Sequence, residues 1–463
     1  MTGLRDAGYS PAVLARSEEV APGLFEPLRL PLVHDALRRD GSPGALLATL
    51  FAYDGAVGQS QLRTAIGAEL TARLTDAGLL DVVGDDVRAV GRLTPLGPRF
   101  VASDRPADGS DAVMPPGPST VELAVLLHPS DSAADIGTGP GSLALLMAGS
   151  GDPVVATDCS PRACAFARAN AHLNGVALDV REGDLLDPVA GERFALVVSQ
   201  PPFVAHPDEL DEVTYLHGGA YGDELSLRLL HGVPDALATD GVAVIRFDST
   251  DDGRPPLAAR ALDPLAGRGV GAALLVRPGH SHDYGAVGYA SVADPSFGPV
   301  YARTAVSYRR HDDSLGVLQH QRALAIVRAG APWRAVVPVD RWPDSLGLML
   351  AALDALSLPD QLLLHQRCRV PEGAHWLVKR PVHGEGDDRM ALACVAPTLV
   401  HEWELTEAGM VVMEALAGGG TVAEAVQALA DAARCETAEL EADVCAAARA
   451  SLARLVLVPV GNA

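Results

Sequence analysis

The stretch AADIGTGPGS, residues 133 to 142, decides the fold of the central part of the chain. An apolar segment leads to Asp135, and Gly137, Gly139 and Gly141 then lie close together before a segment of helical character. Glycines at such a point permit a tight turn and let a ligand approach the backbone, and the following helix N-terminus favours negative or polar groups. The stretch therefore predicts a strand, a turn and a helix with a ligand at the turn. A glycine turn without a ligand is the alternative.

The spacing of these glycines separates two kinds of nucleotide site. It is G-x-G-x-G, because position 142 is Ser142, whereas dinucleotide-binding folds carry G-x-G-x-x-G. A nicotinamide-dependent oxidoreductase is therefore disfavoured.

Strands and helices alternate from residue 120 to about residue 310. This alternation predicts a doubly wound, mostly parallel α/β sheet, in which ligands bind at the carboxyl ends of the strands. Asp158 ends the second predicted strand and can accept both hydroxyl protons of a ribose, and Asp184 follows the third and can accept from an adenine amino group. One such aspartate is more often a solvated strand end. Together with Asp135 they lie on three consecutive strand ends, which favours a nucleoside site.

The fourth strand ends in SQPPF, residues 199 to 203. Gln200 offers an amide acceptor and an amide donor, and the prolines hold the backbone stiff and leave the carbonyl oxygen of Pro201 free to accept. Phe203 adds a flat aromatic face. The segment predicts a clamp for a planar or amine nitrogen that carries hydrogens. A simple strand-ending turn is the alternative.

The order DIGTGPG, ATD, GDLL and SQPPF resembles the class I S-adenosylmethionine-dependent methyltransferases, most strongly over residues 115 to 250. Within them it is similar to the small-domain branch with an (Asn/Asp/Ser)-Pro-Pro-(Tyr/Phe) motif. That branch includes N-specific ribosomal-RNA guanine methyltransferases and release-factor glutamine methyltransferases. The resemblance implies S-adenosylmethionine as cofactor. It implies acceptor-holding catalytic roles for Gln200, Pro201 and Phe203, and cofactor contacts from Asp135, Gly137, Thr138, Gly139, Gly141, Asp158, Cys159, Asp184, Leu185 and Gln200.

This chain departs from the branch at one position, because glutamine stands where the motif has Asn, Asp or Ser. The side chain of Gln200 is one methylene longer, so its carbonyl cannot occupy the same place without a backbone or rotamer change. An acceptor other than a planar nitrogen, such as an aliphatic amine or an oxygen, becomes more plausible.

Further candidates for acceptor contacts lie downstream of the clamp. The glycine-rich segment from 214 to 226 predicts a mobile loop over the site, and Asp223 in it is better explained as a helix cap. His280 and His282 are expected to be solvent-exposed, no metal site is expected, and a general base among these two and His217 stays open. The substrate-binding candidates are Tyr215, His217, Tyr221, Asp223 and His282.

The flanking regions are expected to form separate domains. Residues 1–105 read as helices and a hairpin, a winged-helix-like unit that packs or covers substrate rather than reads DNA. Residues 106–315 hold the predicted methyltransferase sheet. Residues 316–463 form a mixed domain that ends in three helices and a strand, weakly similar to winged-helix domains that bind leader peptides. A structural cap or a homodimer surface is the favoured alternative for this end.

Composition restricts the partners and the compartment. The chain of 463 residues has a net charge of −23 and a single lysine, Lys379, which predicts no tight nucleic-acid binding. Six cysteines match no zinc spacing, no apolar run is long enough to span a membrane, and the start lacks a signal sequence. A cytoplasmic location without membrane association is therefore expected.

The leading interpretation is methyl transfer from S-adenosylmethionine to a nitrogen, or less favourably an oxygen, of a small-molecule or peptide acceptor, for example in natural-product biosynthesis. Methylation of ribosomal RNA or of a protein glutamine is the alternative within the class. From another class, a winged-helix regulator could use the sheet to sense a nucleoside without turnover.

Overall fold

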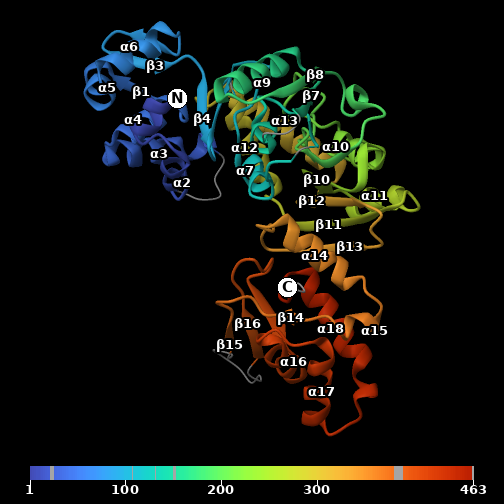
Figure 1. The fold of residues 1–463 in the computed structure, drawn as a ribbon. Helices are drawn as coiled ribbons and strands as arrows, with labels where there is room; N and C mark the ends of the chain where they lie inside the picture. The colour runs from blue at the N-terminus through green and yellow to red at the C-terminus, as the bar shows by residue number, and fades with distance from the viewer. Residues whose placement is uncertain (21–25, 107, 131, 150–152, 380–388, 461–463) are drawn as a thin grey trace. The chain divides into compact units, whose positions relative to one another are not determined.

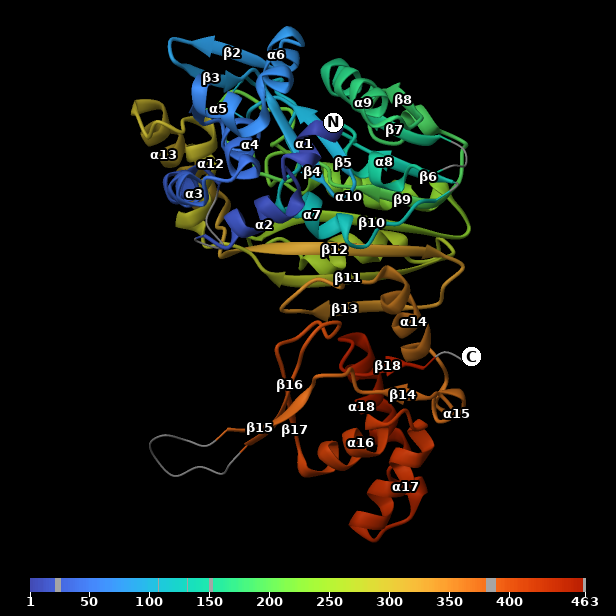
Figure 2. The same ribbon diagram turned by 60° about the vertical axis from the view of Figure 1, so that its left-hand side comes forward.

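The computed structural model describes residues 1–20, 26–106, 108–130, 132–149, 153–379 and 389–460. It divides into two compact units. The first comprises Met1–Arg260 with Gly279–Arg322, and the second comprises Ala261–Pro278 with Ala323–Ala463. The three domains expected from the sequence stay a prediction. Figures 1 and 2 show the elements of both units.

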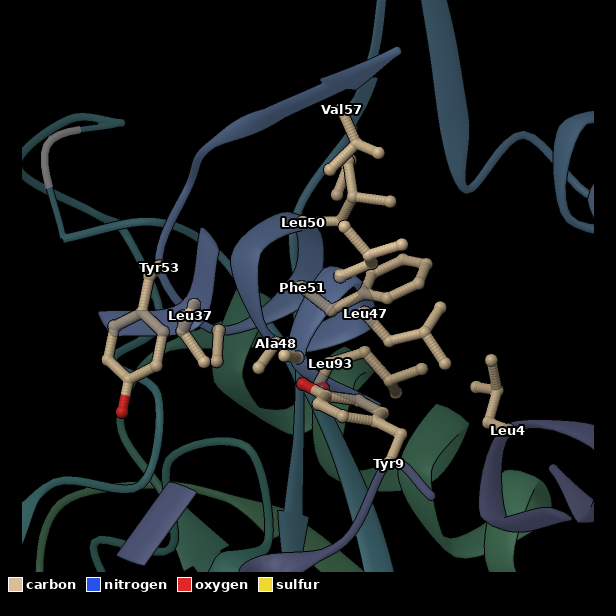
Figure 3. Close-up of a cluster of buried hydrophobic side chains, with 14 of the residues drawn as sticks. Leu4, Tyr9, Leu37, Leu47, Ala48, Leu50, Phe51, Tyr53, Val57 and Leu93 are labelled. Carbon is tan, nitrogen blue, oxygen red and sulfur yellow. The ribbon is translucent and has the colours of Figure 1, made fainter. Parts of the chain in front are cut away.

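The N-terminal part of the first unit is a helical bundle with a small sheet and a hairpin. Apolar side chains from its helices and strands form one buried core, in which the Tyr9 hydroxyl donates to the carbonyl oxygen of Leu93 at 2.6 Å (Figure 3). Strands β1, β3 and β2 pair antiparallel, and β4 pairs with β5. The helices are α1 (Thr2–Asp6), α2 (Pro11–Glu18), α3 (Glu26–Asp40), α4 (Pro43–Phe51), α5 (Gln59–Ile66) and α6 (Ala68–Asp76), and the strands are β1 (Ala56–Gly58), β2 (Leu80–Val83), β3 (Asp86–Ala89), β4 (Arg92–Leu96) and β5 (Arg99–Ser103).

The centre of the first unit is a parallel sheet, which confirms the expected doubly wound arrangement. Its strands lie in the order β10-β9-β6-β7-β8, and every neighbouring pair is parallel. The chain runs outward from β6 through β7 to β8 and returns to β9 on the other side of β6. This change of direction makes a crevice at the carboxyl ends of β6 and β9, where ligands bind in such sheets. The strands are β6 (Ala133–Ile136), β7 (Val154–Asp158), β8 (Leu178–Glu182), β9 (Phe194–Ser199) and β10 (Leu237–Asp251).

Helices follow the strands and complete this unit. Helix α9 is capped at both ends, since the Ser160 hydroxyl accepts from the N–H of Ala163 and Gly175 adopts a left-handed conformation. Tyr308 and Ala286 from two later helices pack with Val204 and Phe203, which follow β9. The helices are α7 (Pro118–Ala124), α8 (Ser142–Met147), α9 (Pro161–Asn174), α10 (Glu224–Gly232), α12 (His282–Ala293) and α13 (Pro299–Leu315).

The second unit has its own core, formed by helices α14 to α18 and short strands. Strands β11 and β13 pair in parallel, β15, β16 and β17 form an antiparallel sheet, and β14 pairs with β18. Three helices and a terminal strand occur as expected. Helix α11 (Leu257–Leu262) and strand β12 (Gln319–Ala329) each begin in the first unit and end in the second. The elements that lie wholly in the second unit are β11 (Val270–Pro278), β13 (Arg334–Pro338), α14 (Leu346–Leu356), α15 (Asp360–Leu363), β14 (Cys368–Arg369), β15 (His375–Lys379), β16 (Arg389–Ala393), β17 (Glu402–Leu405), α16 (Glu407–Ala417), α17 (Val422–Ala433), α18 (Glu441–Ala453) and β18 (Val458–Pro459).

Within the described ranges, no helix is both long enough and apolar enough to cross a membrane.

Candidate active site

The turn after β6 is built from glycines for two different reasons. Gly137, Gly139 and Gly141 have φ values of +71°, +55° and +87°, which non-glycine residues adopt at a cost. A Cβ atom at Gly137 or Gly139 would meet no atom within 4 Å, so this part of the turn faces open space. A Cβ atom at Gly141 would lie 3.3 Å from the Cα of Ala167 on α9, so this glycine permits close helix packing. The first two glycines thus leave room for a ligand.

Asp135 supports the turn from inside the sheet. Its Oδ2 accepts from the Thr138 hydroxyl at 2.7 Å and from the N–H of Ala144 at 3.0 Å. Burial raises the pKa of Asp135 to about 6, although these two hydrogen bonds favour the charged form. The structure therefore gives Asp135 and Thr138 a role in shaping the turn. Their expected contacts with a cofactor stay a prediction.

Asp158 lies at the end of β7, beside the turn. Its Oδ2 accepts from the N–H of Gly139 at 2.8 Å and its Oδ1 from the N–H of Ser160 at 2.9 Å, and burial raises its pKa. Each carboxylate oxygen has a second lone pair, so both can still accept from a ligand hydroxyl. Desolvation by the surrounding residues raises the pKa of the neighbouring Cys159 thiol, and the charges of Asp158 and Asp184 raise it further.

Asp184 is held by a side chain that the sequence did not suggest. Both of its oxygens accept from Arg228, at 2.8 Å and 2.7 Å, and both side chains are more than half exposed. A surface pair of this kind is worth about 0–1 kcal/mol, so a ligand could displace Arg228 at little cost. Leu185 follows in a left-handed conformation with φ of +45°, and its carbonyl oxygen accepts from the Thr157 hydroxyl at 3.3 Å.

The amide of Gln200 is engaged within the protein. Its Oε1 accepts from the Thr120 hydroxyl at 3.0 Å, and its Nε2 donates to the Ser119 hydroxyl at 2.8 Å, at the start of α7. The additional methylene of glutamine thus lets one amide reach two hydroxyls of a neighbouring helix. One lone pair and one N–H remain available, so the expected contact with an acceptor stays a prediction.

A small pocket with a volume of about 10 Å³, room for about one water molecule, lies beyond the two prolines. Its walls come from the segment after β9, from the end of β10 and from helices α12 and α13. Because β9 and β10 are neighbours and β9 also pairs with β6, the pocket lies at the strand ends next to the glycine turn. Side chains that line it include Phe203, Tyr221, Asp248, Tyr289, Tyr308 and Asp312.

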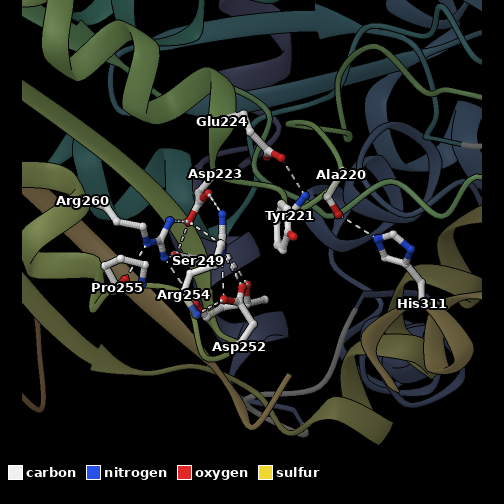
Figure 4. Close-up of polar contacts among 11 residues, drawn as sticks. Ala220, Tyr221, Asp223, Glu224, Ser249, Asp252, Arg254, Pro255, Arg260 and His311 are labelled. Atoms are coloured by element: carbon white, nitrogen blue, oxygen red, sulfur yellow. Dashed lines mark hydrogen bonds and ion pairs between the residues drawn. The ribbon is translucent and has the colours of Figure 1, made fainter. Parts of the chain in front are cut away.

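Asp223 lies at the N-cap position, directly before α10, but its carboxylate makes no capping hydrogen bond to that helix, contrary to the expectation. It is completely buried and accepts from Ser249, from Arg254 at 3.2 Å and from Arg260 (Figure 4). Two partly buried guanidinium groups form charge-assisted hydrogen bonds with the carboxylate, and these are stronger than bonds to the uncharged N–H groups of a helix end. These partners enclose the carboxylate, and the expected contact of Asp223 with an acceptor stays a prediction.

The segment between β9 and α10 is packed against the clamp rather than loosely placed. A Cβ atom at Gly218 would lie 2.4 Å from the carbonyl oxygen of Pro202, and one at Gly222 would lie 2.7 Å from that of Phe203. The glycines predicted to make a mobile loop therefore permit close backbone contact. Tyr221 between them faces the pocket, and the guanidinium of Arg254 lies 3.7 Å from its ring centre.

The histidine candidates have structural surroundings. His217 is buried, its Nδ1 accepts from the N–H of Val213 at 2.9 Å, and its Nε2 contacts the Tyr308 hydroxyl at 2.9 Å. Burial lowers the pKa of His217 to about 4, so it is neutral, and neither ring nitrogen has a lone pair free to act as a base.

His280 was expected in solvent, but burial lowers its pKa to about 4, and its Nε2 contacts the Tyr289 hydroxyl at 3.0 Å. His282 starts α12, and its Nε2 lies 3.7 Å from Asp313. The side chain of Tyr215 is bound outside the pocket, because its hydroxyl donates to the carbonyl oxygen of Pro106 at 2.9 Å. Neither His282 nor Tyr215 lines the pocket described above.

Sequence reasoning missed Asn170, which is fully buried on α9. Its amide donates to the carbonyl oxygen of Pro140 inside the glycine turn at 2.8 Å and exchanges two hydrogen bonds with Ala102 on β5, both at 2.8 Å. It thereby ties the turn to the N-terminal hairpin. A polar residue on the apolar face of a predicted helix was the available signal. The pocket residues on β10 and α13 gave no motif.

Comparisons with known proteins agree with this geometry. A family model described as methyltransferase small domain matches residues 119–216. Release factor glutamine methyltransferase from Deinococcus radiodurans is 34% identical over 135 residues, 27% of this chain and 48% of that protein. The protein of the same name from Geobacter sulfurreducens is 32% identical over 139 residues, 27% of this chain and 49% of that protein. This chain thus spans about half the length of these relatives.

A solved structure of ribosomal protein L11 methylase from Lactobacillus delbrueckii has a TM-score of 0.23 and 23% identity, and covers 32% of this chain and 67% of that chain.

The region that matches the methyltransferase small domain, residues 119–216, contains the glycine turn, Asp158, Asp184 and the SQPPF segment. The curated relatives named above are release factor glutamine methyltransferases.

The residues of the turn fit S-adenosylmethionine. The space in front of Gly137 and Gly139 is open to a ligand, and the carboxylate of Asp158 retains two lone pairs for ribose hydroxyls. Among the described residues, no cluster of three or more His, Cys, Asp or Glu side chains could hold a metal ion.

Proposed function

We propose that this chain transfers the methyl group of S-adenosylmethionine to a nitrogen atom of a peptide or protein acceptor. The observation that carries this proposal is the pocket behind Phe203, which opens at the strand ends beside the glycine turn. An acceptor nitrogen at the mouth of this pocket would approach a methyl group held at the turn. The sequence favoured a small-molecule or peptide acceptor, and the names of the relatives support a protein nitrogen, the glutamine amide, over a small molecule.

Ribosomal RNA is the weaker acceptor class. The net charge of −23 repels a phosphate backbone, which proteins hold mainly by neutralising its charge. We also propose that the flanking regions are winged-helix-like, that the protein works in the cytoplasm, and that a homodimer would use the C-terminal region.

The side chains of this protein would bind and align the reactants. Asp158 would hold the ribose hydroxyls, and the pair formed by Asp184 and Arg228 would border the adenine. Gln200 fixes α7 against the end of β9 through Ser119 and Thr120, which keeps Pro201 and Phe203 in place. When bound, S-adenosylmethionine supplies a methyl group on a positively charged sulfur. Alignment and exclusion of water would then provide most of the rate.

The experiment is a methyl-transfer assay on the full chain with S-adenosylmethionine that carries a tritiated methyl group. The acceptors are a release factor, glutamine and lysine peptides, small amines and ribosomal RNA, with mass spectrometry to locate the methyl group. Label on a peptide or protein nitrogen is expected. Label only on RNA or on small molecules contradicts the proposal. Cofactor binding without turnover on any acceptor would instead indicate the nucleoside-sensing regulator.

A further inference from the structure

Two asparagines of helix α9 dock the N-terminal hairpin, and one of them also holds the glycine turn. We propose that Asn170 is a positioning residue for the cofactor, which couples strand β5 to the turn after β6. The contact of Asn170 with Ala102 on β5 and the binding of the cofactor then strengthen each other. This inference rests on the proposed function and concerns the regulation of its cofactor site by the N-terminal part of the chain.

The two asparagines lie one helical turn apart and pair with alternate residues of β5. Oδ1 of Asn170 accepts from the N–H of Ala102, and its Nδ2 donates to the carbonyl oxygen of the same residue, both at 2.8 Å. Asn174 makes the same two hydrogen bonds with Phe100, at 2.9 Å and 2.7 Å. Four residues of a helix rise by about 6 Å and two residues of a strand by about 6.5 Å, so the two amides match the spacing along the strand. They thereby satisfy backbone groups on the open edge of the two-stranded sheet formed by β4 and β5.

The third hydrogen bond of each amide distinguishes the two asparagines. Nδ2 of Asn170 donates to the carbonyl oxygen of Pro140 at 2.8 Å, inside the turn between Gly139 and Gly141. Nδ2 of Asn174 donates instead to the backbone carbonyl oxygen of Asn170 at 2.8 Å, within α9. Both side chains therefore support β5 in the same way, and of the two it is Asn170 that joins the strand to the turn.

The surroundings of Asn170 make this link rigid. Its side chain is completely buried, and both of its amide N–H groups and its oxygen are engaged. A buried polar network with every group satisfied is rigid, and removal of one member leaves its partners unpaired. Close packing of Gly141 against Ala167 fixes the turn on α9 as well. At Gly139, in contrast, the turn faces open space, so α9 holds the turn while this part stays accessible to the cofactor.

The size of the coupling follows from the hydrogen bond to Pro140. A turn that is already held in one conformation has less freedom to lose when the cofactor binds. One hydrogen bond between neutral groups corresponds to roughly a 3- to 10-fold change in an equilibrium constant. Coupling between two binding events is reciprocal, so the cofactor should tighten the contact between Asn170 and Ala102 by the same factor.

The first test is calorimetric titration of S-adenosylhomocysteine into the full chain and into the variants Asn170→Ala and Asn174→Ala. Each variant removes two hydrogen bonds to β5, and Asn170→Ala also removes the one to the turn. Asn170→Ala should bind about 3- to 10-fold more weakly, and Asn174→Ala should bind as the wild type does. Equal affinities of the two variants would overturn the inference. If S-adenosylhomocysteine does not bind the wild type, the proposed function fails instead.

The second test measures the coupling from the other side, by hydrogen exchange of backbone amides in NMR spectra of the deuterated wild-type chain. The N–H of Ala102 donates to Asn170, so saturating S-adenosylhomocysteine should slow its exchange about 3- to 10-fold. The same slowing should persist in Asn174→Ala. A merely structural role of Asn170 would not connect β5 to the ligand, and an Ala102 amide that exchanges at the same rate with and without it would overturn the coupling. Because this measurement uses the wild type, it decides even if Asn170→Ala does not fold.

Discussion

Gly139 has a left-handed backbone and faces open space, and Gly139→Ala tests whether the cofactor binds at this point. Its φ of +55° is the left-handed conformation, and a Cβ atom there would meet nothing within 4 Å. Its N–H donates to Asp158 at 2.8 Å. The substitution therefore adds a methyl group to the open space of the turn without a clash in the unliganded protein.

Two effects of the substitution are expected, one on folding stability and one on cofactor affinity, and each has its own physical cause. A non-glycine residue in the left-handed conformation costs about 1–2 kcal/mol of folding free energy. That loss is small against the ~5–15 kcal/mol by which domains are stable, so the variant should fold. Cofactor affinity suffers separately, because the methyl group keeps a ligand from the backbone and from Asp158. Loss of one hydrogen bond to a charged group is worth about 1.5–3 kcal/mol, which is at least a 10-fold loss of affinity.

Gly175→Ala is the matched control. Gly175 follows α9 with φ of +64°, and a Cβ atom there also meets nothing within 4 Å. It should lose the same ~1–2 kcal/mol of stability through the same backbone strain. Because it lies at the other end of α9 from the site, its affinity for S-adenosylhomocysteine should equal that of the wild type.

The assay is calorimetric titration of S-adenosylhomocysteine into each full-length protein, with denaturant unfolding to measure stability. Weakened binding by Gly139→Ala alone, at equal stability loss, is the expected result. The reasoning is refuted if Gly139→Ala binds as tightly as Gly175→Ala, since the open face of the turn would then not be the cofactor site.

Four further predictions concern single groups or the whole chain. Asp158→Ala should bind S-adenosylhomocysteine at least ~10-fold more weakly by calorimetry, because two ribose hydrogen bonds are lost; unchanged affinity in a folded variant would contradict the assignment. Gln200→Ala should keep cofactor affinity but turn over ~10- to 1000-fold more slowly. Gln200→Asn should be nearly as slow, because the shorter amide cannot reach both Ser119 and Thr120. If both variants turn over at the wild-type rate, Gln200 merely ends a strand and has no role in turnover. Burial raises the pKa of Asp135 from 3.8 to about 6, so its contribution to stability is largest below pH 4 and is lost as the pH rises through 6. Relative to Asp135→Asn, the wild type should lose roughly 2–3 kcal/mol of unfolding free energy between pH 4 and pH 7, measured by denaturant titration, and a constant difference would contradict the burial of its charge. A gel shift at low salt should show no sub-micromolar binding of ribosomal RNA, whereas tight, salt-sensitive binding would favour the RNA acceptor.

The sequence predicted those parts of the site that depend on local order along the chain. A strand end, a glycine turn and a helix start are determined by neighbouring residues, so the places of Asp135, Gly139 and Asp158 followed from periodicity and turn chemistry. The parallel sheet could also be predicted from the sequence, because strands that alternate with helices are joined by right-handed crossover connections, which make the strands parallel.

Contacts between distant segments could not be predicted in this way. The partners of Gln200 lie about eighty residues earlier in the chain, and nothing in SQPPF indicates hydroxyls on α7. Asp223 has the sequence position of a helix cap, but Arg254 and Arg260 compete for it only once β10 and α11 have folded beside it. His280 was expected in solvent, because burial against Tyr289 depends on how α12 packs.

The most direct test of the central claim is a crystal structure of the full chain with S-adenosylhomocysteine. The ribose hydroxyls are expected to contact the carboxylate of Asp158, the ligand is expected to fill the space in front of Gly137 and Gly139, and its sulfur is expected to face the pocket at Phe203. A ligand bound elsewhere, or one with its sulfur directed away from that pocket, would contradict methyl transfer at this site.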